Sequence, residues 1–403
     1  MDVEIRTIAP EEFEAYARAL ELAFSDRITD EDLERERLVA ETGRWHAAVD
    51  GGRIVGGAAA ASYRVSVPGG REVATAGVTA VGVLPTHRRR GVNTALMRAQ
   101  LDDVHLRGEP LAILFASEGG IYGRFGYGMA SFLCAMEAEA DRSRFVRGYR
   151  PSGEVRLLTR DDALPAMRPV YDAVQRERPG MVKMDDRWWD WLFAEKKDEG
   201  PTFYAVHEGG DGVDAFAVYR AKHEWPDSVA KVEVAVHRLM ASTPQGWADM
   251  WRYVFDIDLV HKVEAWNRPL DDPVLRLVQE PRRLHFSVKD GLFARLVDVP
   301  AALAARGYVG DGRTVFEVHD PFCPWNHGRF ALEASGGTAS CEATTDTADI
   351  ACSATDLGAV YLGGTTFRQL QRAGHAGELR AGALAATDAM FASDPAPWCP
   401  FVF

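Results

Sequence analysis

The stretch VTAVGVLPTHRRRGVNTALM, residues 78–97, says most about how this chain folds. The apolar run that ends at Val83 predicts a strand, and Pro85 predicts a turn after it. Val92 and Leu96 stand four residues apart, as on one apolar face of a helix. A strand that leads through a short loop into a helix is typical of an α/β layer.

The loop in this stretch has the properties of an anion site. A helix N-terminus offers unpaired N–H groups and the positive end of the helix dipole. Gly91 lets the backbone approach a ligand closely, and Arg88, Arg89 and Arg90 supply charge and bidentate contacts to phosphate. An isolated HRRR would be a solvated basic patch or a nucleic-acid contact. The strand and helix around it favour a diphosphate site.

Outward from this loop the chain divides into three segments, at 1–148, 149–286 and 287–403. Periodicity and turn signals give the elements of each segment. In the first they are strands at 3–9, 44–50, 53–67, 77–83 and 111–116, with helices from Pro10 and at 93–108. In the second they are helices at 161–177 and 247–258 and strands at 202–208, 212–222 and 231–241. In the third they are strands at 292–299, 314–320, 329–334 and 348–354, then helices at 355–364 and 379–392. A mixed α/β fold follows.

Two further patterns bear on the second segment. The sequence STPQG follows its strand at 231–241, where the first segment has the arginine-rich loop, so no phosphate site is expected there. Trp188, Trp189 and Trp191 have helical spacing, which favours a place in the core over a ligand cage.

Composition bounds the class of protein. The 403 residues contain 47% hydrophobic and 26% charged residues, as in soluble globular proteins, and suggest two or three domains. No apolar run approaches the ~20 residues of a membrane helix, and no signal pattern opens the chain, so we expect a cytoplasmic protein without membrane insertion. The formal charge of −13 disfavours nucleic-acid partners and weakly favours amine substrates.

The five cysteines are scattered, which indicates a reducing compartment rather than a disulfide framework. Cys323 stands between His319 and His327, so a metal site and a loop of buried side chains are both conceivable. The spacing matches no established ligand pattern, and we expect no metal.

The arginine-rich loop resembles the acetyl-CoA motif of the GNAT superfamily of N-acetyltransferases, Arg/Gln-x-x-Gly-x-Gly/Ala after an apolar strand. Arg88 and Gly91 match this motif, and Asn93 departs from it. The resemblance implies acetyl-CoA as co-substrate, with the pantetheine arm along the strand before the loop. The cofactor-binding residues it implies are Val81, Gly82, Val83, Arg88, Arg89, Arg90, Gly91, Val92, Asn93, Thr94, Ser117 and Glu118.

A second motif, FASEGGIYGRFGYG at 115–128, resembles the Tyr-x-x-x-Gly-Phe/Tyr element of the same superfamily. There the tyrosine is the general acid toward the departing thiolate, which implies this role for Tyr122. A phenol of pKa ~10 stays protonated at neutral pH and can protonate a thiolate whose own pKa is ~8.5. Alone, Tyr122 would be a buried structural tyrosine. Tyr127 is the other candidate, and spacing prefers Tyr122.

The whole chain resembles the enhanced intracellular survival (Eis) family of aminoglycoside and lysine N-acetyltransferases. The loop, the SEGGIYGRFGYG element and a length near 400 residues ending in Phe carry this resemblance. It implies a GNAT domain at 1–148, a second GNAT-like domain without cofactor loop at 149–286, and a sterol-carrier-protein-like domain at 287–403. It also implies a homohexamer.

The same resemblance implies that the chain's own C-terminal carboxylate, at Phe403, is the general base. An α-carboxyl is ionised at neutral pH, and prolines at 395, 397 and 400 make the apolar tail an extended peptide rather than a helix. For the acceptor pocket we expect Phe24, Asp26, Glu118 and Val402. Asp26 would equally cap a turn.

These patterns predict an acetyl-CoA-dependent N-acetyltransferase that acts on primary amines such as aminoglycosides, polyamines or lysine side chains. Transfer is direct, with Phe403 as base and Tyr122 as acid. The alternative is a non-catalytic lipid carrier or coenzyme A-sensing protein, in which the third segment holds the lipid.

Overall fold

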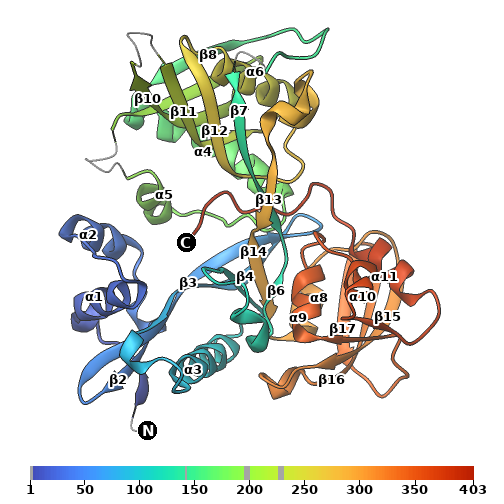
Figure 1. Cartoon of the computed structure of the whole chain (residues 1–403). Helices are drawn as coiled ribbons and strands as arrows, with labels where there is room; N and C mark the ends of the chain where they lie inside the picture. Colours follow the sequence, from blue (N-terminus) through green and yellow to red (C-terminus); the bar gives the residue numbers. More distant parts are fainter. Residues whose placement is uncertain (1–2, 141–142, 195–199, 226–230) are drawn as a thin grey trace.

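The strand, loop and helix predicted from residues 78–97 form β4 (Arg71–Val83) and α3 (Val92–Leu106) in the computed structural model, which describes residues 3–140, 143–194, 200–225 and 231–403. Three sheets with helices packed on them make up the molecule (Figure 1). The predicted mixed α/β class is confirmed.

The first sheet has seven strands in the order β1-β2-β3-β4-β5-β14-β6. Its other strands are β1 (Glu4–Thr7), β2 (His46–Asp50), β3 (Arg53–Val67), β5 (Leu111–Phe115), β6 (Gly128–Met129) and β14 (Leu292–Leu296). Only β4 and β5 pair in parallel among its ladders, and α3 supplies the crossover that a parallel pair needs.

Two helices cover opposite faces of this sheet because the side chains of β2 alternate. Ala47 packs with α1 (Phe13–Phe24), and Ala48 packs with α3 on the other side. Thr29 caps α2 (Asp30–Val39), which lies beside α1 (Figure 1).

The second sheet has the order β13-β7-β12-β11-β10-β9-β8. Its strands are β7 (Phe132–Glu139), β8 (Glu154–Leu158), β9 (Thr202–Gly209), β10 (Gly212–Glu224), β11 (Lys231–Ala241), β12 (Val260–Arg268) and β13 (Ser287–Asp290). Its helices are α4 (Arg160–Glu177), α5 (Asp186–Leu192), α6 (Pro244–Phe255) and α7 (Val274–Leu277). The unit β11-α6-β12 repeats β4-α3-β5, because β11 and β12 are also parallel. Trp188 and Trp189 in α5 are buried, as predicted, whereas Trp191 is partly buried and packs against the core.

The sheets cross the predicted segment limits. β7 comes from the first segment but pairs in the second sheet, and β14 returns from the third segment to lie between β5 and β6. All five residues of β14 are buried, so the strand needs neighbours on both edges and both faces. The domain limits at 148/149 and 286/287 stay a prediction.

The third sheet has the order β17-β16-β15-β18-β19. Its strands are β15 (Gly312–His319), β16 (Gly328–Ser335), β17 (Thr338–Ala343), β18 (Ile350–Ser353) and β19 (Gly377–Glu378). Its helices are α8 (Val299–Ala305), α9 (Ala354–Val360), α10 (Phe367–Arg372) and α11 (Ala383–Phe391). The rings of Phe316, Phe367 and Phe391 pack together inside it, with centroids 5.5–6.1 Å apart.

The chain then leaves α11 as an extended tail that returns toward the first two sheets, where the C-terminus lies near α5 (Figure 1). Among the described residues, no helix combines the length and the apolar character needed to cross a membrane.

Candidate active site

The site begins where β4 and β5 separate. Their parallel pairing covers only Thr75–Gly77 and Leu111–Ile113, although both strands continue beyond it. The register of β4 against β3 shifts beside Ala80, which has a left-handed φ of 47°. Such a bulge bends a strand. The end of β4, Val81–Val83, therefore lacks a partner strand on its β5 side and faces a gap.

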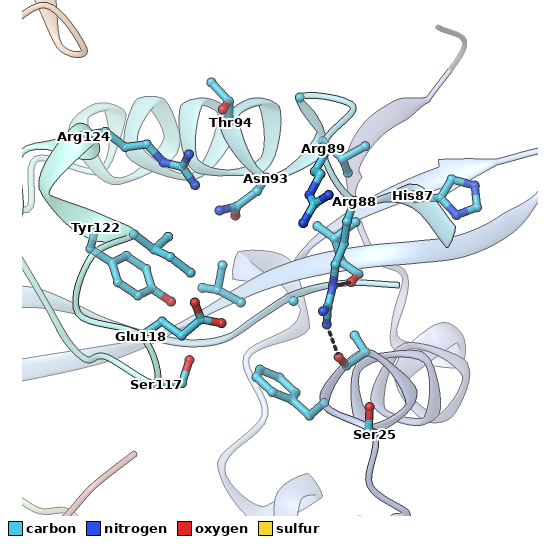
Figure 2. A pocket seen from close by; sticks show the side chains of 18 residues that line it. Ser25, His87, Arg88, Arg89, Asn93, Thr94, Ser117, Glu118, Tyr122 and Arg124 are labelled. Atoms are coloured by element: carbon cyan, nitrogen blue, oxygen red, sulfur yellow. Dashed lines mark hydrogen bonds between the residues drawn. The ribbon is translucent and has the colours of Figure 1, made fainter. Parts of the chain in front are cut away.

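A cavity of about 650 Å³ fills this gap (Figure 2). It is bounded by the end of β4, the turn η3 (Pro85–His87), the N-terminus of α3 and the turn η4 (Tyr122–Phe125). Its lining consists of Ala23, Phe24, Ser25, Val81, Gly82, Val83, His87, Arg88, Arg89, Gly91, Val92, Asn93, Thr94, Ser117, Glu118, Ile121, Tyr122 and Arg124. Two sequence motifs, which the rest of α3 and most of β5 separate along the chain, thus meet around one space.

The N-terminus of α3 is open toward this space. Gly91 takes the N-cap position with a φ of 81°, and no side chain caps the helix. A Cβ at Gly91 would meet no atom within 4 Å, so the backbone conformation, and not crowding, calls for glycine. The Oδ1 atom of Asn93, in the first turn, is buried without a hydrogen-bond partner. Free N–H groups and an unsatisfied amide at one helix end suit an anionic, polar ligand.

The three arginines of the loop, which the sequence alone does not distinguish, have different contacts in the structure. Arg88 donates from Nε to the carbonyl of Val83 at 3.1 Å and from Nη2 to the carbonyl of Ala23 at 2.8 Å, so it fixes the loop to α1 (Figure 2). Arg89 lines the cavity, with a φ of 60°. Arg90 is exposed and is not part of the lining.

Of the two candidate tyrosines, only Tyr122 lines the cavity. Burial raises the pKa of the Tyr122 hydroxyl, and the nearby Glu118 carboxylate raises it further. Figure 2 shows the Tyr122 hydroxyl on the same side of the cavity as Glu118. Tyr127 is completely buried, burial raises its pKa strongly, and its hydroxyl has no hydrogen-bond partner. Its ring supports that of Tyr122 edge-on, with centroids 6.0 Å apart.

The turn that carries Tyr122 rests on the third domain. Thr355, in the first turn of α9, donates to the carbonyl of Gly123 at 2.9 Å. Gly126 has a φ of 83°, and a Cβ there would lie 2.2 Å from Nη1 of Arg295. Arg295 itself is buried and pairs with Asp320 at 2.5 Å. Residues from β14 and from beyond β15 thus fix the position of this turn.

The chain's last residue reaches the same end of the first sheet. The Phe403 ring contacts Tyr63 of β3, with centroids 5.0 Å apart, and Phe115 of β5, with centroids 5.6 Å apart. Phe401 is only 1% exposed, whereas Val402 is 40% exposed. The tail is packed into the protein rather than frayed.

Asp26 lies apart from the cavity lining and is exposed. Its Oδ1 accepts a hydrogen bond from the backbone N–H of Arg27 at 2.8 Å, a geometry that agrees with the turn-capping alternative. Five lining residues were not predicted: Ala23, Ser25, His87, Ile121 and Arg124. The sequence could have indicated Arg124 and His87 as lining residues, because both are basic residues within the two quoted motifs.

The three residues considered for a metal site, His319, Cys323 and His327, contact other side chains in the structure. Cys323 is buried beside the Arg295 guanidinium. The rings of His319 and His327 contact each other, with centroids 5.4 Å apart. Among the described residues, no group of three His, Cys, Asp or Glu side chains is placed to hold a metal ion.

In the second domain, the place that corresponds to the cavity is built differently. The hydroxyl of Thr243 accepts from the N–H of Gly246 at 2.9 Å and so caps α6. Arg268 at the end of β12 donates from Nη1 to the carbonyl of Leu239 on β11 at 2.7 Å. A side chain therefore bridges the two strand ends that remain apart in the first domain.

Comparisons with known proteins agree with this geometry. Residues 4–130 and 180–296 match families described as acetyltransferase (GNAT) domains, and residues 299–400 match the sterol carrier protein domain. An uncharacterized N-acetyltransferase of Streptomyces avermitilis is 42% identical over the whole of both chains. N-acetyltransferase Eis of Mycobacterium tuberculosis is 34% identical over 85% of this chain and 84% of its own. The crystal structure of Eis1 from Mycobacterium abscessus matches with a TM-score of 0.87 and 32% identity, over 99% of this chain and 100% of that one.

Proposed function

Because the chain belongs to the Eis family of GNAT N-acetyltransferases, we propose that it transfers the acetyl group of acetyl-CoA directly to a primary amine. The enzyme class and the order of two GNAT domains and a sterol-carrier-like domain are as predicted. The observation that carries the proposal is the cavity in which an uncapped helix N-terminus and Tyr122 face the same space.

The first half of the cavity supports acetyl-CoA as the acyl donor. The N–H groups at the start of α3 and the Arg89 guanidinium would bind the pyrophosphate. The backbone of Val81–Val83, which β5 leaves unpaired, would bind the pantetheine arm as a strand-like partner. The gap between β4 and β5 thereby aims the thioester toward Tyr122.

Tyr122 in the cavity lining, and Phe403, whose ring packs on Phe115, support the chemistry of transfer. The attacking ammonium gives a proton to the Phe403 carboxylate, and the amine nitrogen then bonds to the thioester carbon. A backbone N–H of Val81–Val83 stabilises the oxyanion of the tetrahedral intermediate. As the carbon–sulfur bond breaks, Tyr122 gives its proton to the sulfur. Its raised pKa keeps that proton in place until the thiolate forms. The amide nitrogen releases its second proton, which restores the Tyr122 phenol through solvent, and the Phe403 carboxyl gives its proton to solvent.

The acceptor that we propose is a primary amine of an aminoglycoside, a polyamine or a lysine side chain. Glu118 offers negative charge inside the cavity, and Phe24 offers an exposed aromatic face at its rim. Val402 is exposed beside Phe403 and adds no charge. The assembly that we propose is a homohexamer, by resemblance to the Eis family, and analytical ultracentrifugation tests it.

The test of the activity is a thiol-release assay with acetyl-CoA and a panel of the three amine classes. We expect amine-dependent release of one thiol per acetylated amine, with the product identified by mass spectrometry. Absence of release with every class, together with tight lipid binding, would support the carrier alternative instead.

A further inference from the structure

The ends of β11 and β12 form a binding groove for the protein's own tail. Beyond their parallel pairing, Arg268 bridges the two strands, and its guanidinium is buried and paired with Asp272 at 2.8 Å. The indole of Trp398 lies beside this guanidinium at 5.5 Å, as Trp247 does at 5.4 Å. The tail thus occupies the place in the second domain that corresponds to the cavity of the first.

Asn267 makes the most specific contacts in this groove. It is buried at the end of β12, with a left-handed φ of 53°. Its Nδ2 donates to the carbonyl of Cys399 at 3.0 Å, and its Oδ1 accepts from the indole N–H of Trp398 at 3.0 Å. The side-chain amide of Asn267 therefore hydrogen-bonds to two consecutive tail residues, once as donor and once as acceptor. Its left-handed backbone conformation is one that Asn adopts more readily than most residues.

A second set of contacts holds the tail three residues earlier. Arg178 pairs with Asp271 at 2.8 Å and donates to the carbonyl of Ala396 at 2.7 Å. The other carboxylate oxygen of Asp271 accepts from the N–H of Ala396 at 3.0 Å. The backbone N–H of Trp398 donates to the carbonyl of Pro179 at 2.8 Å. The backbone of 396–399 is thus fixed on both sides by the second domain.

We propose that the second GNAT domain acts as a socket for residues 396–399 and so positions the Phe403 carboxylate at the cavity of the first domain. Asn267, Arg178 and Asp271 are its positioning residues. From Cys399, the last residue that the socket holds, to Phe403 the chain spans four residues, a reach of at most ~14 Å, so fixing the tail at the socket limits where the carboxylate can lie. Holding a base in place in this way raises its effective concentration. The catalytic part of this proposal rests on the proposed role of Phe403.

The test uses the full-length enzyme with Asn267→Ala and Asp271→Asn. Asp256→Asn is the matched control, because Asp256 forms an exposed ion pair with Arg252 in the same domain and does not contact the tail. The first readout is the rate at which carboxypeptidase releases Phe403, followed by mass spectrometry. We expect release about tenfold faster in Asn267→Ala, which loses two hydrogen bonds to the tail, and unchanged release in the control.

The second readout is the steady-state kinetics of the same proteins. We expect kcat to fall about tenfold in Asn267→Ala while the KM for acetyl-CoA stays within a factor of two. The loss should be smaller at pH 9 than at pH 7, since more of the amine is then already deprotonated. A purely structural defect would not give this dependence on pH.

The outcomes separate the two proposals. Unchanged release of Phe403 in both variants would overturn the socket. Faster release with wild-type kcat would leave the socket standing and overturn the role of Phe403 as base. Asp271 is 35% exposed, so Asp271→Asn gives a folded variant for the comparison even if Asn267→Ala is unstable.

Discussion

The ring of Phe403 meets the ring of Phe115 edge-on, with centroids 5.6 Å apart and planes at 76°. Phe115 is the last residue of β5, and Ser117, two positions further, lines the cavity. The end of the chain thus packs against a residue that lies two positions from the cavity lining.

Deletion of Phe403 should lower kcat about 100-fold or more, because the terminal carboxylate would move back by one residue, ~3.5 Å. The KM for acetyl-CoA should stay close to wild type, as measured by thiol release. Phe403→Leu is the control, since it keeps the carboxylate in register and loses only the aromatic contacts. Wild-type kcat in the deletion variant would exclude Phe403 as the base.

Tyr122→Phe should lower kcat about 100-fold, because the thiolate would leave without a proton donor. Tyr127→Phe should have little effect, since Tyr127 is buried outside the cavity lining. Both variants keep the aromatic packing, so their circular dichroism should match that of the wild type. Equal losses in the two variants would refute the assignment of the acid.

The pH profile gives an independent test of Tyr122. Burial and Glu118 raise its pKa in the folded protein above the ~10 of an unfolded chain. The protonated phenol therefore contributes stability in full below pH 10, and this contribution is lost only as the pH rises through the higher folded pKa. We therefore expect that ionisation of Tyr122 does not lower kcat below pH 10. A fall caused by this ionisation would be present in the wild type and absent in Tyr122→Phe. Such a fall, measured by thiol release between pH 7 and 10, would contradict the raised pKa.

Arg89→Ala should weaken coenzyme A binding about tenfold, because it removes a charge-assisted contact to phosphate from the cavity. Arg90→Ala is its natural partner variant and should bind coenzyme A as the wild type does, since Arg90 is exposed outside the lining. Isothermal titration calorimetry at fixed salt measures both. A larger loss in Arg90→Ala than in Arg89→Ala would show that the loop binds phosphate in another orientation.

Gly126→Ala should destabilise the fold by about 2 kcal/mol or more, because its Cβ would lie 2.2 Å from Nη1 of Arg295 at a φ of 83°. Gly123→Ala, in the same turn, meets no atom within 4 Å of the added Cβ and should change the Tm little. Thermal unfolding of the two variants checks this. Similar Tm values for both would show that Arg295 moves aside without cost.

Local signals predicted the parts of the molecule that depend on neighbouring residues. The strands at 53–67 and 231–241 have the predicted limits because their apolar patterns end at turns or capping residues. The connection from β4 to α3 was predictable as well, since the Arg-rich loop and Gly91 lie between a strand and a helix in the sequence itself.

Contacts between segments that lie far apart in the sequence could not be predicted from local patterns. Periodicity predicts the strand that contains Leu292–Leu296, but nothing in its sequence tells that it lies between β5 and β6. The sequence predicts Arg88 as a phosphate ligand, but it does not show the bonds from Arg88 to the carbonyls of Val83 and Ala23. Asn267 stands outside any motif, and its role depends on a tail more than 100 residues further along the chain.

The placement of β14 also means that the first sheet cannot be completed until residues 292–296 have been synthesised. A ribosome completes β5 and β6 long before it reaches Leu292, so the nascent first sheet stays open at the edges that β14 later fills. Those edges are unpaired backbone, the kind of surface on which immature chains aggregate. A gene fragment that encodes only residues 1–148 therefore lacks the strand that joins β5 to β6.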